Sequence, residues 1–501
     1  MRNTTDKHKT AYLMVQGTMS NAGKSLIVAG LCRVFAQDGY RVCPFKSQNM
    51  ALNSYVTDDN LEMGRAQVMQ AEAAGIRPSV YMNPILLKPT GDMKSQVIVN
   101  GKVLADLSAK EYYEKKTRFI PDIKNALNTL SKDYEIIVIE GAGSPAEINL
   151  KDNDIVNMGM AKIANAPVIL AGDIDRGGVF AQIYGTVMLL EDDEKARIKG
   201  MIINKFRGDK TILDPGIKQI EELTKIPVCG VLPYIDISLD DEDSLAERLN
   251  NSKKGDIDIA VIKLSHISNF TDFNVFDEYD GVEVRYVKEA YELGDPDLVI
   301  IPGSKNTIAD MQAIRNNGLD EAIIKHAENG RPVFGICGGF QMLGNKIADP
   351  EGVEGGGETD GLNLLPVDTY LTGEKRRELS KGRFGVTGGI FGGLSGCAYS
   401  GYEIHMGRSN ALYDGLNAFT ENGSGYNCGN IYGTYVHGIF DEDGVADEIV
   451  RALYKAKGLT YNREKISRKS FKESQYDKLA DMIRSNMDMK YIYKIMGLKA
   501  E

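Results

Sequence analysis

Two short stretches of this chain contain residue types that could do chemistry. The first, GTMSNAGKS from Gly17 to Ser25, is a glycine-bounded loop that ends in Lys-Ser. In such a loop the backbone N–H groups surround phosphate oxygens, the lysine reaches the β- and γ-phosphates, and the hydroxyl lies on Mg²⁺. The second, GICGG from Gly335 to Gly339, places a cysteine in a tight turn, where it can act as a nucleophile. The sequence therefore predicts phosphate binding and thiol chemistry in one chain.

The phosphate-binding loop is favoured by what flanks it. An apolar run at 12–15 leads into the loop, and a helix-like run at 26–31 leads out. The spacing departs from the common pattern, because five residues separate the two glycines and a threonine holds the usual glycine position. A plain turn that carries Lys-Ser is the alternative. We assign nucleotide contacts to Gly17, Thr18, Asn21, Ala22, Gly23, Lys24 and Ser25.

Carboxylates follow two of the predicted strands. The strand at 135–140 ends in Glu140, and a carboxylate there could hold Mg²⁺ together with Ser25. Asp173 and Arg176 follow the next strand, where a substrate carboxylate would meet the γ-phosphate and the guanidinium could bind it bidentately. The alternatives are a solvated glutamate and an aspartate helix cap beside a surface arginine.

Two polar loops complete the site predicted for this half of the chain. Asn204 follows a strand and could read the edge of adenine. Lys46, Gln48 and Asn49 follow the strand at 41–45, and amides beside a lysine suit a substrate with several carboxylates and amides. An ordinary polar loop is a fair competitor for this last interpretation.

A nucleophilic cysteine needs a base and an oxyanion hole. Cys337 precedes helix-forming residues, and a helix N-terminus favours a thiolate. Two histidines could be the base; we prefer His437 to His405, because His437 ends a strand and is followed by glycine. N–H groups of Gly338 and of the Gly303 region could supply the oxyanion hole. A buried structural cysteine is the alternative, which the surrounding glycines disfavour.

The elements around these residues alternate between apolar runs and helical patterns, which predicts an α/β fold with two parallel-sheet domains. We expect a P-loop NTPase-like domain at 1–236, a linker at 237–256, a second α/β domain at 257–445 and a helical extension at 446–501. The acidic run at 240–243 is interpreted as solvated surface. In the extension, Leu479, Ile483 and their neighbours form a stripe at helical spacing, which predicts a docking face.

Composition excludes several classes of protein. The chain has 501 residues and a formal net charge of −11, which argues against nucleic acid as a partner. No stretch approaches the ~20 apolar residues that a membrane span needs. The six cysteines include no C-x-x-C pair, so neither a disulfide framework nor a structural zinc site is expected, and a reducing cytoplasm fits best.

Taken together, these motifs resemble one family, the cobyric acid synthases. The resemblance covers nearly the whole chain and keeps the order of the motifs, which are Gly17–Ser25, Lys46–Asn53, the strand that ends in Glu140, Asp173–Gly178, Gly335–Gly339, Gly401–Arg408 and Tyr435–Phe440. It implies an N-terminal domain like dethiobiotin synthetase and a C-terminal class I glutamine amidotransferase domain. It also implies that ATP, Mg²⁺ and L-glutamine are used to amidate the b, d, e and g carboxylates of adenosylcobyrinic acid a,c-diamide.

The resemblance makes Cys337 the nucleophile and His437 its partner. Many class I amidotransferases have a glutamate two residues after this histidine, but position 439 is an isoleucine here, so what orients His437 is left open. Two rivals remain. One is a cobyrinic acid a,c-diamide synthase, which has the same domain types but different target carboxylates. The other is a nucleotide-switched scaffold of the MinD-like type with an inactive second domain, which the cysteine turn and His437 argue against.

Overall fold

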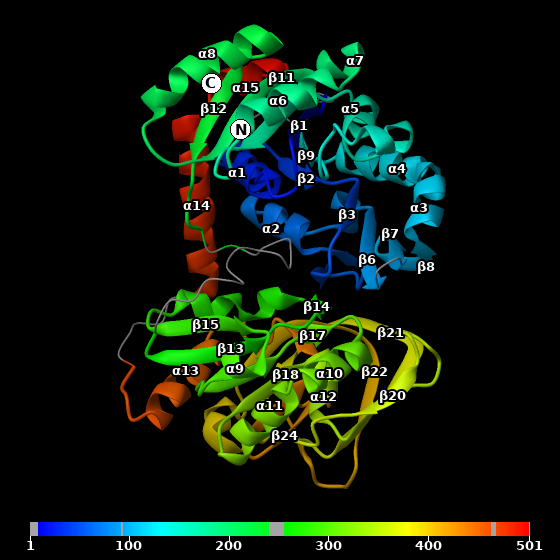
Figure 1. The fold of residues 1–501 in the computed structure, drawn as a ribbon, viewed down its shortest axis with the longest axis vertical. Helices are drawn as coiled ribbons and strands as arrows, with labels where there is room; N and C mark the ends of the chain where they lie inside the picture. The colour runs from blue at the N-terminus through cyan, green and yellow to red at the C-terminus, as the bar shows by residue number, and fades with distance from the viewer. Residues whose placement is uncertain (1–8, 92–93, 238, 240–254, 462–466, 500–501) are drawn as a thin grey trace.

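The structure is a computed structural model that describes residues 9–91, 94–237, 239, 255–461 and 467–499. Figure 1 shows two α/β bodies stacked along the long axis, with the N-terminal body above the C-terminal body. The predicted acidic surface run at 240–243 lies outside the described residues, as does most of the predicted linker at 237–256. Among the described residues, no helix has both the length and the apolar character to cross a bilayer.

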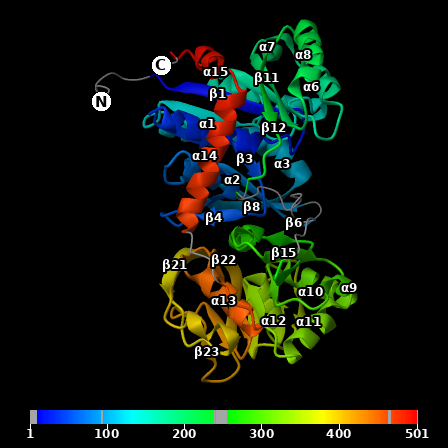
Figure 2. The ribbon, with the colours of Figure 1, turned by 90° about the vertical axis from the view of Figure 1, so that its left-hand side faces the viewer.

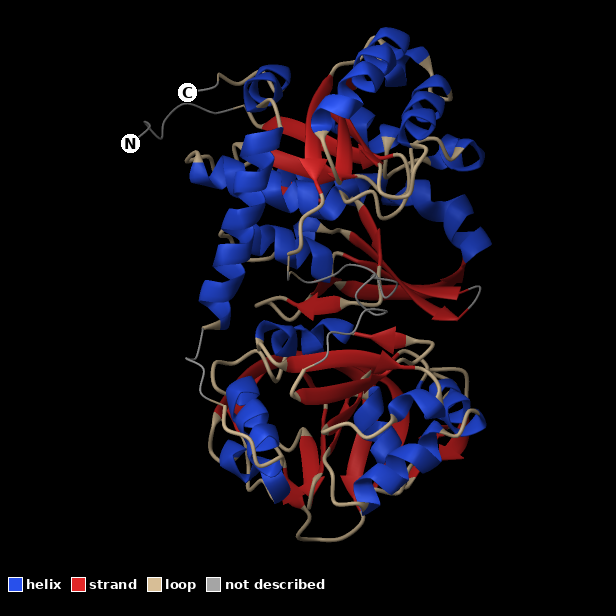
Figure 3. Cartoon of the chain, turned by 60° about the vertical axis from the view of Figure 1, so that its left-hand side comes forward, coloured by secondary structure: helices blue, strands red, loops and turns tan. Residues whose placement is uncertain are grey.

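The N-terminal body is built on a six-stranded sheet in the order β12-β11-β10-β1-β9-β2, and all its neighbouring strands are parallel. Every residue of β9 is buried, because helices cover both faces of the sheet (Figure 3). The strands are β1 (Ala11–Gly17), β2 (Val42–Phe45), β9 (Ile136–Glu140), β10 (Val168–Asp173), β11 (Ile198–Phe206) and β12 (Val228–Pro233). The helices are α1 (Lys24–Gln37), α2 (Arg65–Ala73), α3 (Ala109–Lys115), α4 (Ile120–Leu130), α5 (Met158–Ala164), α6 (Val179–Met188), α7 (Asp192–Lys195) and α8 (Lys210–Thr224).

A smaller sheet lies on the side of the N-terminal body nearest the C-terminal body (Figures 1 and 3). Its strand order is β3-β6-β7-β8, and a separate antiparallel pair joins β4 to β5. The sequence analysis did not predict these strands. They are β3 (Gln48–Met50), β4 (Ser54–Val56), β5 (Glu62–Gly64), β6 (Ile85–Gly91), β7 (Lys94–Val99) and β8 (Lys102–Ser108).

The C-terminal body has a seven-stranded sheet in the order β15-β13-β16-β18-β25-β24-β23, of which the first five strands are parallel. The predicted α/β class with two parallel-sheet domains is thereby confirmed. These strands are β13 (Ile257–Ile262), β15 (Val282–Val287), β16 (Leu298–Ile301), β18 (Val333–Ile336), β23 (Asn417–Ala418), β24 (Gly425–Cys428) and β25 (Ile431–Thr434). The helices are α9 (Ala290–Leu293), α10 (Thr307–Asn316), α11 (Leu319–Glu328), α12 (Gly338–Leu343) and α13 (Val445–Ala456).

A second sheet in this body, in the order β20-β19-β21-β22-β26, is dominated by two long antiparallel strands. Residues 402–405, which include the competing base His405 at their end, lie in one of them, β22, and not in the parallel sheet. The strands are β19 (Lys346–Asp349), β20 (Gly357–Asp360), β21 (Val367–Arg383), β22 (Ala398–Ala411) and β26 (Val436–His437), and a two-stranded pair joins β14 (Ile267–Ser268) to β17 (Gly303–Ser304).

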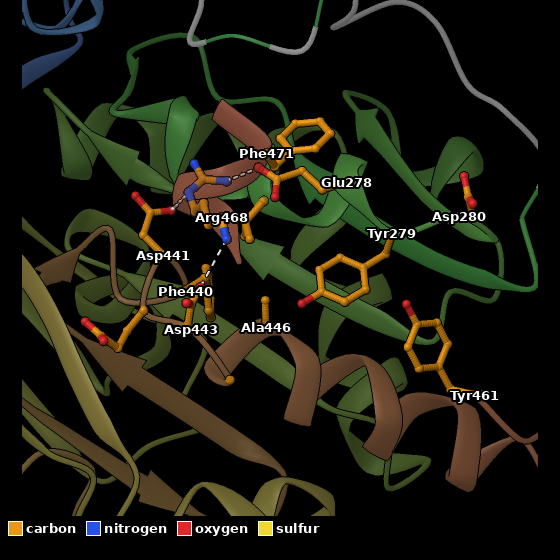
Figure 4. Close-up of a pocket in the computed structure, with 13 residues that line it drawn as sticks. Glu278, Tyr279, Asp280, Phe440, Asp441, Asp443, Ala446, Tyr461, Arg468 and Phe471 are labelled. Atoms are coloured by element: carbon orange, nitrogen blue, oxygen red, sulfur yellow. Dashed lines mark hydrogen bonds and ion pairs between the residues drawn. The ribbon is translucent and has the colours of Figure 1, made fainter. Parts of the chain in front are cut away.

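The C-terminal segment returns to the N-terminal body as α14 (Arg468–Asn486) and α15 (Met489–Ile495), which Figure 2 shows along its side. At its start, Arg468 pairs with Glu278 and Asp441 of the C-terminal body (Figure 4). Further along, Leu479 and Ile483 of α14 are buried against α1, and Arg33 of α1 pairs with Asp477 at 2.8 Å. The last helices therefore tie the two bodies together.

Candidate active sites

The loop after β1 has the backbone geometry of a phosphate cradle. Gly23 has φ of +89° and forms the N-cap of α1, and Asn21 also has a positive φ of 59°. Lys24 is only 7% exposed, and its ammonium group donates to the carbonyls of Met19 at 3.0 Å and Gly143 at 3.3 Å. The lysine therefore reaches back over its own loop, which is where a nucleotide's phosphates would lie.

Hydrogen bonds to neighbouring strands hold this loop in place. The N–H of Thr18 donates to the carbonyl of Ala171 at 2.9 Å, and its hydroxyl donates to Gln182 at 3.1 Å. The side-chain amide of Asn204 donates to the carbonyl of Ala22 at 2.9 Å. A Cβ at Gly23 would lie 2.1 Å from that amide, so only glycine fits there. Asn204 therefore contacts the loop itself, and its contact with adenine stays a prediction.

Glu140 is the centre of the polar groups beside the loop. It is 1% exposed, and it accepts hydrogen bonds from the Ser25 hydroxyl and the Lys46 ammonium, both at 2.9 Å. The amides of Gln67 and Gln70 donate to its other oxygen at 3.3 and 2.5 Å. The structure thus brings the two predicted Mg²⁺ ligands, Ser25 and Glu140, together.

This donor set fits Mg²⁺, which takes one or two protein oxygens and leaves its other positions to phosphate and water. Among the described residues, no group of three or more His, Cys, Asp or Glu side chains could hold a metal alone. Gln67 and Gln70 were missed by the sequence analysis, although their spacing of three on a helix is a usable signal.

The three substrate residues predicted after the strand at 41–45 contact different partners in the structure. Lys46 lies in the phosphate site, paired with Glu140. Asn49 donates to Gln67 at 3.0 Å, and Gln48 accepts from the hydroxyl of Tyr112 at 2.6 Å. A substrate contact for these three residues stays a prediction.

Asp173 and Arg176 end up in different surroundings, although they are close in sequence. The Asp173 carboxylate is fully buried and pairs with the Lys205 ammonium at 2.9 Å, a contact that the sequence analysis missed. Lys205 has a positive φ of 59°, so the backbone turns sharply there. Arg176 is exposed. A contact of Arg176 with a substrate carboxylate stays a prediction.

Cys337 occupies a strained turn between β18 and α12. Its φ of 51° and ψ of −108° lie in a region that residues with a side chain rarely adopt. A Cβ at Gly339 would lie 1.9 Å from the carbonyl of Ile301, and one at Gly335 would lie 2.6 Å from the carbonyl of Gly339. The flanking glycines are thus required by close backbone contacts, and the turn has the geometry of a nucleophile elbow.

The ring of His437 is oriented by an aspartate that the sequence analysis missed. Its Nδ1 lies 2.7 Å from Oδ2 of Asp272, and the other carboxylate oxygen accepts from the N–H of Gly438 at 2.9 Å. Asp272 is 165 residues away in sequence, in the 3-10 helix η5 (Phe270–Glu278). No local motif could have identified it. Asp272 can therefore orient His437, and the roles of Cys337 as nucleophile and His437 as base stay predictions.

Charge interactions favour the imidazolium form of His437. Burial disfavours the charged ring, but Asp272 and then Cys337 outweigh burial and raise its pKa to about 10. Its Nε2 is buried and has no hydrogen-bond partner within the described part of the chain. The thiol of Cys337 is the second group that raises this pKa, so the ring is coupled to a carboxylate and to the nucleophile.

The competing histidine, His405, has both ring nitrogens engaged elsewhere. Its Nδ1 lies 2.8 Å from the carbonyl of Gly407, and its Nε2 lies 3.2 Å from Glu403. Its ring stacks on Tyr435 with centroids 3.7 Å apart. The geometry therefore favours His437 as the base.

The predicted oxyanion-hole residues lie near the elbow. A Cβ at Gly338 would lie 2.7 Å from the backbone nitrogen of Ser304, and one at Gly303 would lie 3.1 Å from Cε1 of His437. Gly338 is the first residue of α12, where backbone N–H groups have no partner within the helix. The structure brings both glycines to the nucleophile, and their role towards an oxyanion stays a prediction.

Comparisons with known proteins agree on both halves of the chain. Residues 13–244 match the family described as CobQ/CobB/MinD/ParA nucleotide binding domain, and residues 258–445 match the CobB/CobQ-like glutamine amidotransferase domain. A cobyric acid synthase of Ruminiclostridium cellulolyticum is 57% identical over 97% of this chain and 96% of its own length. One of Lachnoclostridium phytofermentans is 54% identical over 97% of this chain and 98% of its own length. The first half is thus a nucleotide-binding domain and the second a glutamine amidotransferase domain.

Proposed function

The chain belongs to the cobyric acid synthase family, and on that premise we propose that it amidates the b, d, e and g carboxylates of adenosylcobyrinic acid a,c-diamide. The reaction uses ATP, Mg²⁺ and L-glutamine. The observation that carries this proposal is the presence, in one chain, of a complete thiol triad at Cys337 and a phosphate cradle at Gly17–Ser25.

The C-terminal domain releases ammonia from glutamine. The Cys337 sulfur attacks the side-chain amide carbon, and N–H groups near Gly338 and Gly303 stabilise the oxyanion. His437 protonates the leaving ammonia, and a thioester remains on the cysteine. Water then hydrolyses the thioester, with His437 taking its proton. Asp272 holds the histidine tautomer throughout, because it accepts the Nδ1 proton.

The N-terminal domain activates the carboxylate. Lys24 contacts the β- and γ-phosphates of ATP, and Ser25 and Glu140 would hold Mg²⁺, which offsets the negative charge of the phosphates. A corrin carboxylate oxygen attacks the γ-phosphorus, the bond from that phosphorus to the β,γ-bridging oxygen breaks, and an acyl phosphate and ADP are formed. Ammonia then displaces phosphate and leaves the amide. Asp173, Arg176, Gln48, Asn49 and Lys46 are the residues we propose to face the acceptor carboxylate, and Asn204 the adenine.

Two further assignments concern the domain bounds and the location of the enzyme. We place the domain bounds at 1–236, 257–445 and 446–501, with 237–256 as the connection; α13, at the start of the extension, packs into the core of the C-terminal body. We place the enzyme in the cytoplasm, because all six cysteines are free. L-glutamine and the corrin are its partners.

Mass analysis of the product tests this function. After incubation with ATP, L-glutamine and adenosylcobyrinic acid a,c-diamide, we expect stepwise conversion of the remaining side-chain carboxylates to amides. Cys337→Ala should abolish amidation from glutamine and retain amidation from free ammonia. Conversion of cobyrinic acid to its a,c-diamide, without reaction of the diamide, would establish the rival diamide synthase instead. Glutamine-dependent activity in Cys337→Ala would disprove the thiol mechanism.

A further inference from the structure

The pocket that contains Cys337 is lined by residues of both bodies. Lys88 of β6 comes from the N-terminal body, and Lys375 of β21 comes from the long hairpin of the C-terminal body. Lys305, from the loop between β17 and α10, lines the same pocket together with Glu354. Three ammonium groups thus surround the space beside the nucleophile.

Two of these lysines are held by one carboxylate from the N-terminal body. Glu62 is fully buried, and its two oxygens accept from Lys88 at 2.8 Å and from Lys375 at 2.6 Å. Lys88 also donates to the hydroxyl of Ser54, and Lys375 also donates to the side chain of Gln96. A buried carboxylate between two ammonium groups is held firmly, because removing either partner leaves an uncompensated charge.

Lys305 differs from the other two lysines. Within the described residues, its ammonium group has neither a hydrogen bond nor an ion pair, although nearby charges act on it. Burial lowers the pKa of Lys375 to about 7; Glu62 opposes this, and the charges of Lys305 and Lys88 add to it. Lys88, Lys305 and the charged form of Lys375 outnumber the carboxylates of Glu354, which lines the pocket, and of Glu62, which pairs with two of the lysines, so the pocket attracts an anion.

We propose that Lys305 binds the α-carboxylate of L-glutamine while the side-chain amide lies at Cys337. This carboxylate is the only anionic group of the substrate, and Lys305 is the lining cation that has no side-chain hydrogen bond or ion pair in the described part of the chain. Lys88 and Lys375 maintain the positive potential around it, and Glu62 positions both. The inference rests on the proposed glutaminase function and adds that the N-terminal body completes the glutamine site.

The test compares two substrates in the full chain. L-glutamine carries the α-carboxylate, and 4-aminobutanamide is the same molecule without it. For Lys305→Met we expect kcat/KM for glutamine to fall about 10- to 100-fold, mainly through KM, because a charge-assisted hydrogen bond is lost. Hydrolysis of 4-aminobutanamide should change less than about twofold. Lys305→Arg, which keeps the charge, should recover most of the glutamine affinity.

Matched variants separate this role from a structural one. Glu62→Gln should also raise the KM for glutamine without raising that for 4-aminobutanamide. Arg377 is the control, because it donates to the carbonyls of Asn60 and Gly101 across the same interface but does not line the pocket. Arg377→Met should leave the KM for glutamine within about twofold. Amidation supported by free ammonia reports in every variant whether the chain is folded.

The outcomes distinguish the inference from the function on which it rests. An equal loss for both substrates in Lys305→Met, or no loss for either, would overturn the assignment of Lys305. A normal KM in Lys305→Met together with a raised KM in Lys375→Met would overturn it in favour of the hairpin lysine. Failure of Cys337→Ala to abolish glutamine hydrolysis would instead overturn the proposed function.

Discussion

Asp272 can be tested by a substitution that preserves its shape. In Asp272→Asn, the amide oxygen can keep the hydrogen bond from Gly438, which is 2.9 Å in the structure. The NH₂ group then faces Nδ1 of His437 across a distance that is 2.7 Å in the native protein. Nδ1 must accept that hydrogen bond, so the ring proton moves to Nε2. A protonated Nε2 on a neutral ring cannot take a proton from Cys337.

The size of the effect follows from the charge interactions of the ring. Raising the His437 pKa from its ordinary 6.5 to about 10 corresponds to about 5 kcal/mol of preference for the imidazolium, and Asp272 comes first among the groups that raise this pKa. In serine hydrolases the same aspartate-to-asparagine change costs about 10⁴ in kcat. We therefore expect the glutamine-supported kcat to fall between about 10² and 10⁴.

Two assays make the interpretation specific. Glutamine hydrolysis at saturating substrate measures kcat, and alkylation of Cys337 by iodoacetamide at pH 7 measures whether the thiol still gives up its proton. Both rates should fall in Asp272→Asn, whereas amidation from free ammonia should persist. A variant with wild-type kcat and wild-type alkylation would refute the assignment of Asp272 as the residue that orients the base.

Three further predictions concern the other sites. Glu140→Gln should reduce ATP-dependent amidation at least about 10²-fold with either nitrogen source, because Ser25 and Lys46 lose the carboxylate that both contact. A coupled assay of ADP release measures this loss, and normal activity with ammonia would contradict the prediction. Gly30→Val should lower the free energy of unfolding by about 1–3 kcal/mol, because a Cβ at this position would already lie 2.8 Å from Ile483 of α14. Urea titration measures this change, and an unchanged midpoint of the unfolding transition would count against the docking of α14 on α1. The raised pKa of His437 stabilises the folded state fully below pH 6.5, and this contribution is lost as the pH rises through about 10. The difference in free energy of unfolding between the wild type and His437→Gln should therefore narrow between these pH values, as measured by urea titration. A difference that stays constant over this range would contradict the charged ring.

The parallel sheets could be predicted because their strands are continuous apolar runs. The run predicted at 135–140 is observed as Ile136–Glu140, with every residue buried. The cysteine elbow could also be predicted, because close backbone contacts around Cys337 admit only glycine and the sequence shows these glycines on both sides of the cysteine. In both cases the physical constraint acts on consecutive residues, so the sequence alone displays it.

The missed features depend on contacts between distant segments. Asp272 lies in a 3-10 helix and meets His437 only through folding. Glu62 and Lys375 come from different bodies, on strands β5 and β21 that the sequence analysis did not predict. Polar residues in such strands have the composition of loops, and burial in pairs across an interface leaves no periodic pattern.

Isotope labelling tests the central claim most directly, namely that nitrogen released at Cys337 is used at the phosphate loop. The chain is supplied with ATP, adenosylcobyrinic acid a,c-diamide and L-glutamine labelled with ¹⁵N in its side-chain amide, in the presence of equimolar unlabelled ammonium. We predict that the new amides carry mainly ¹⁵N in the wild type and only ¹⁴N in Cys337→Ala. Equal labelling from both sources in the wild type, or ¹⁵N in the product of the variant, would contradict the account.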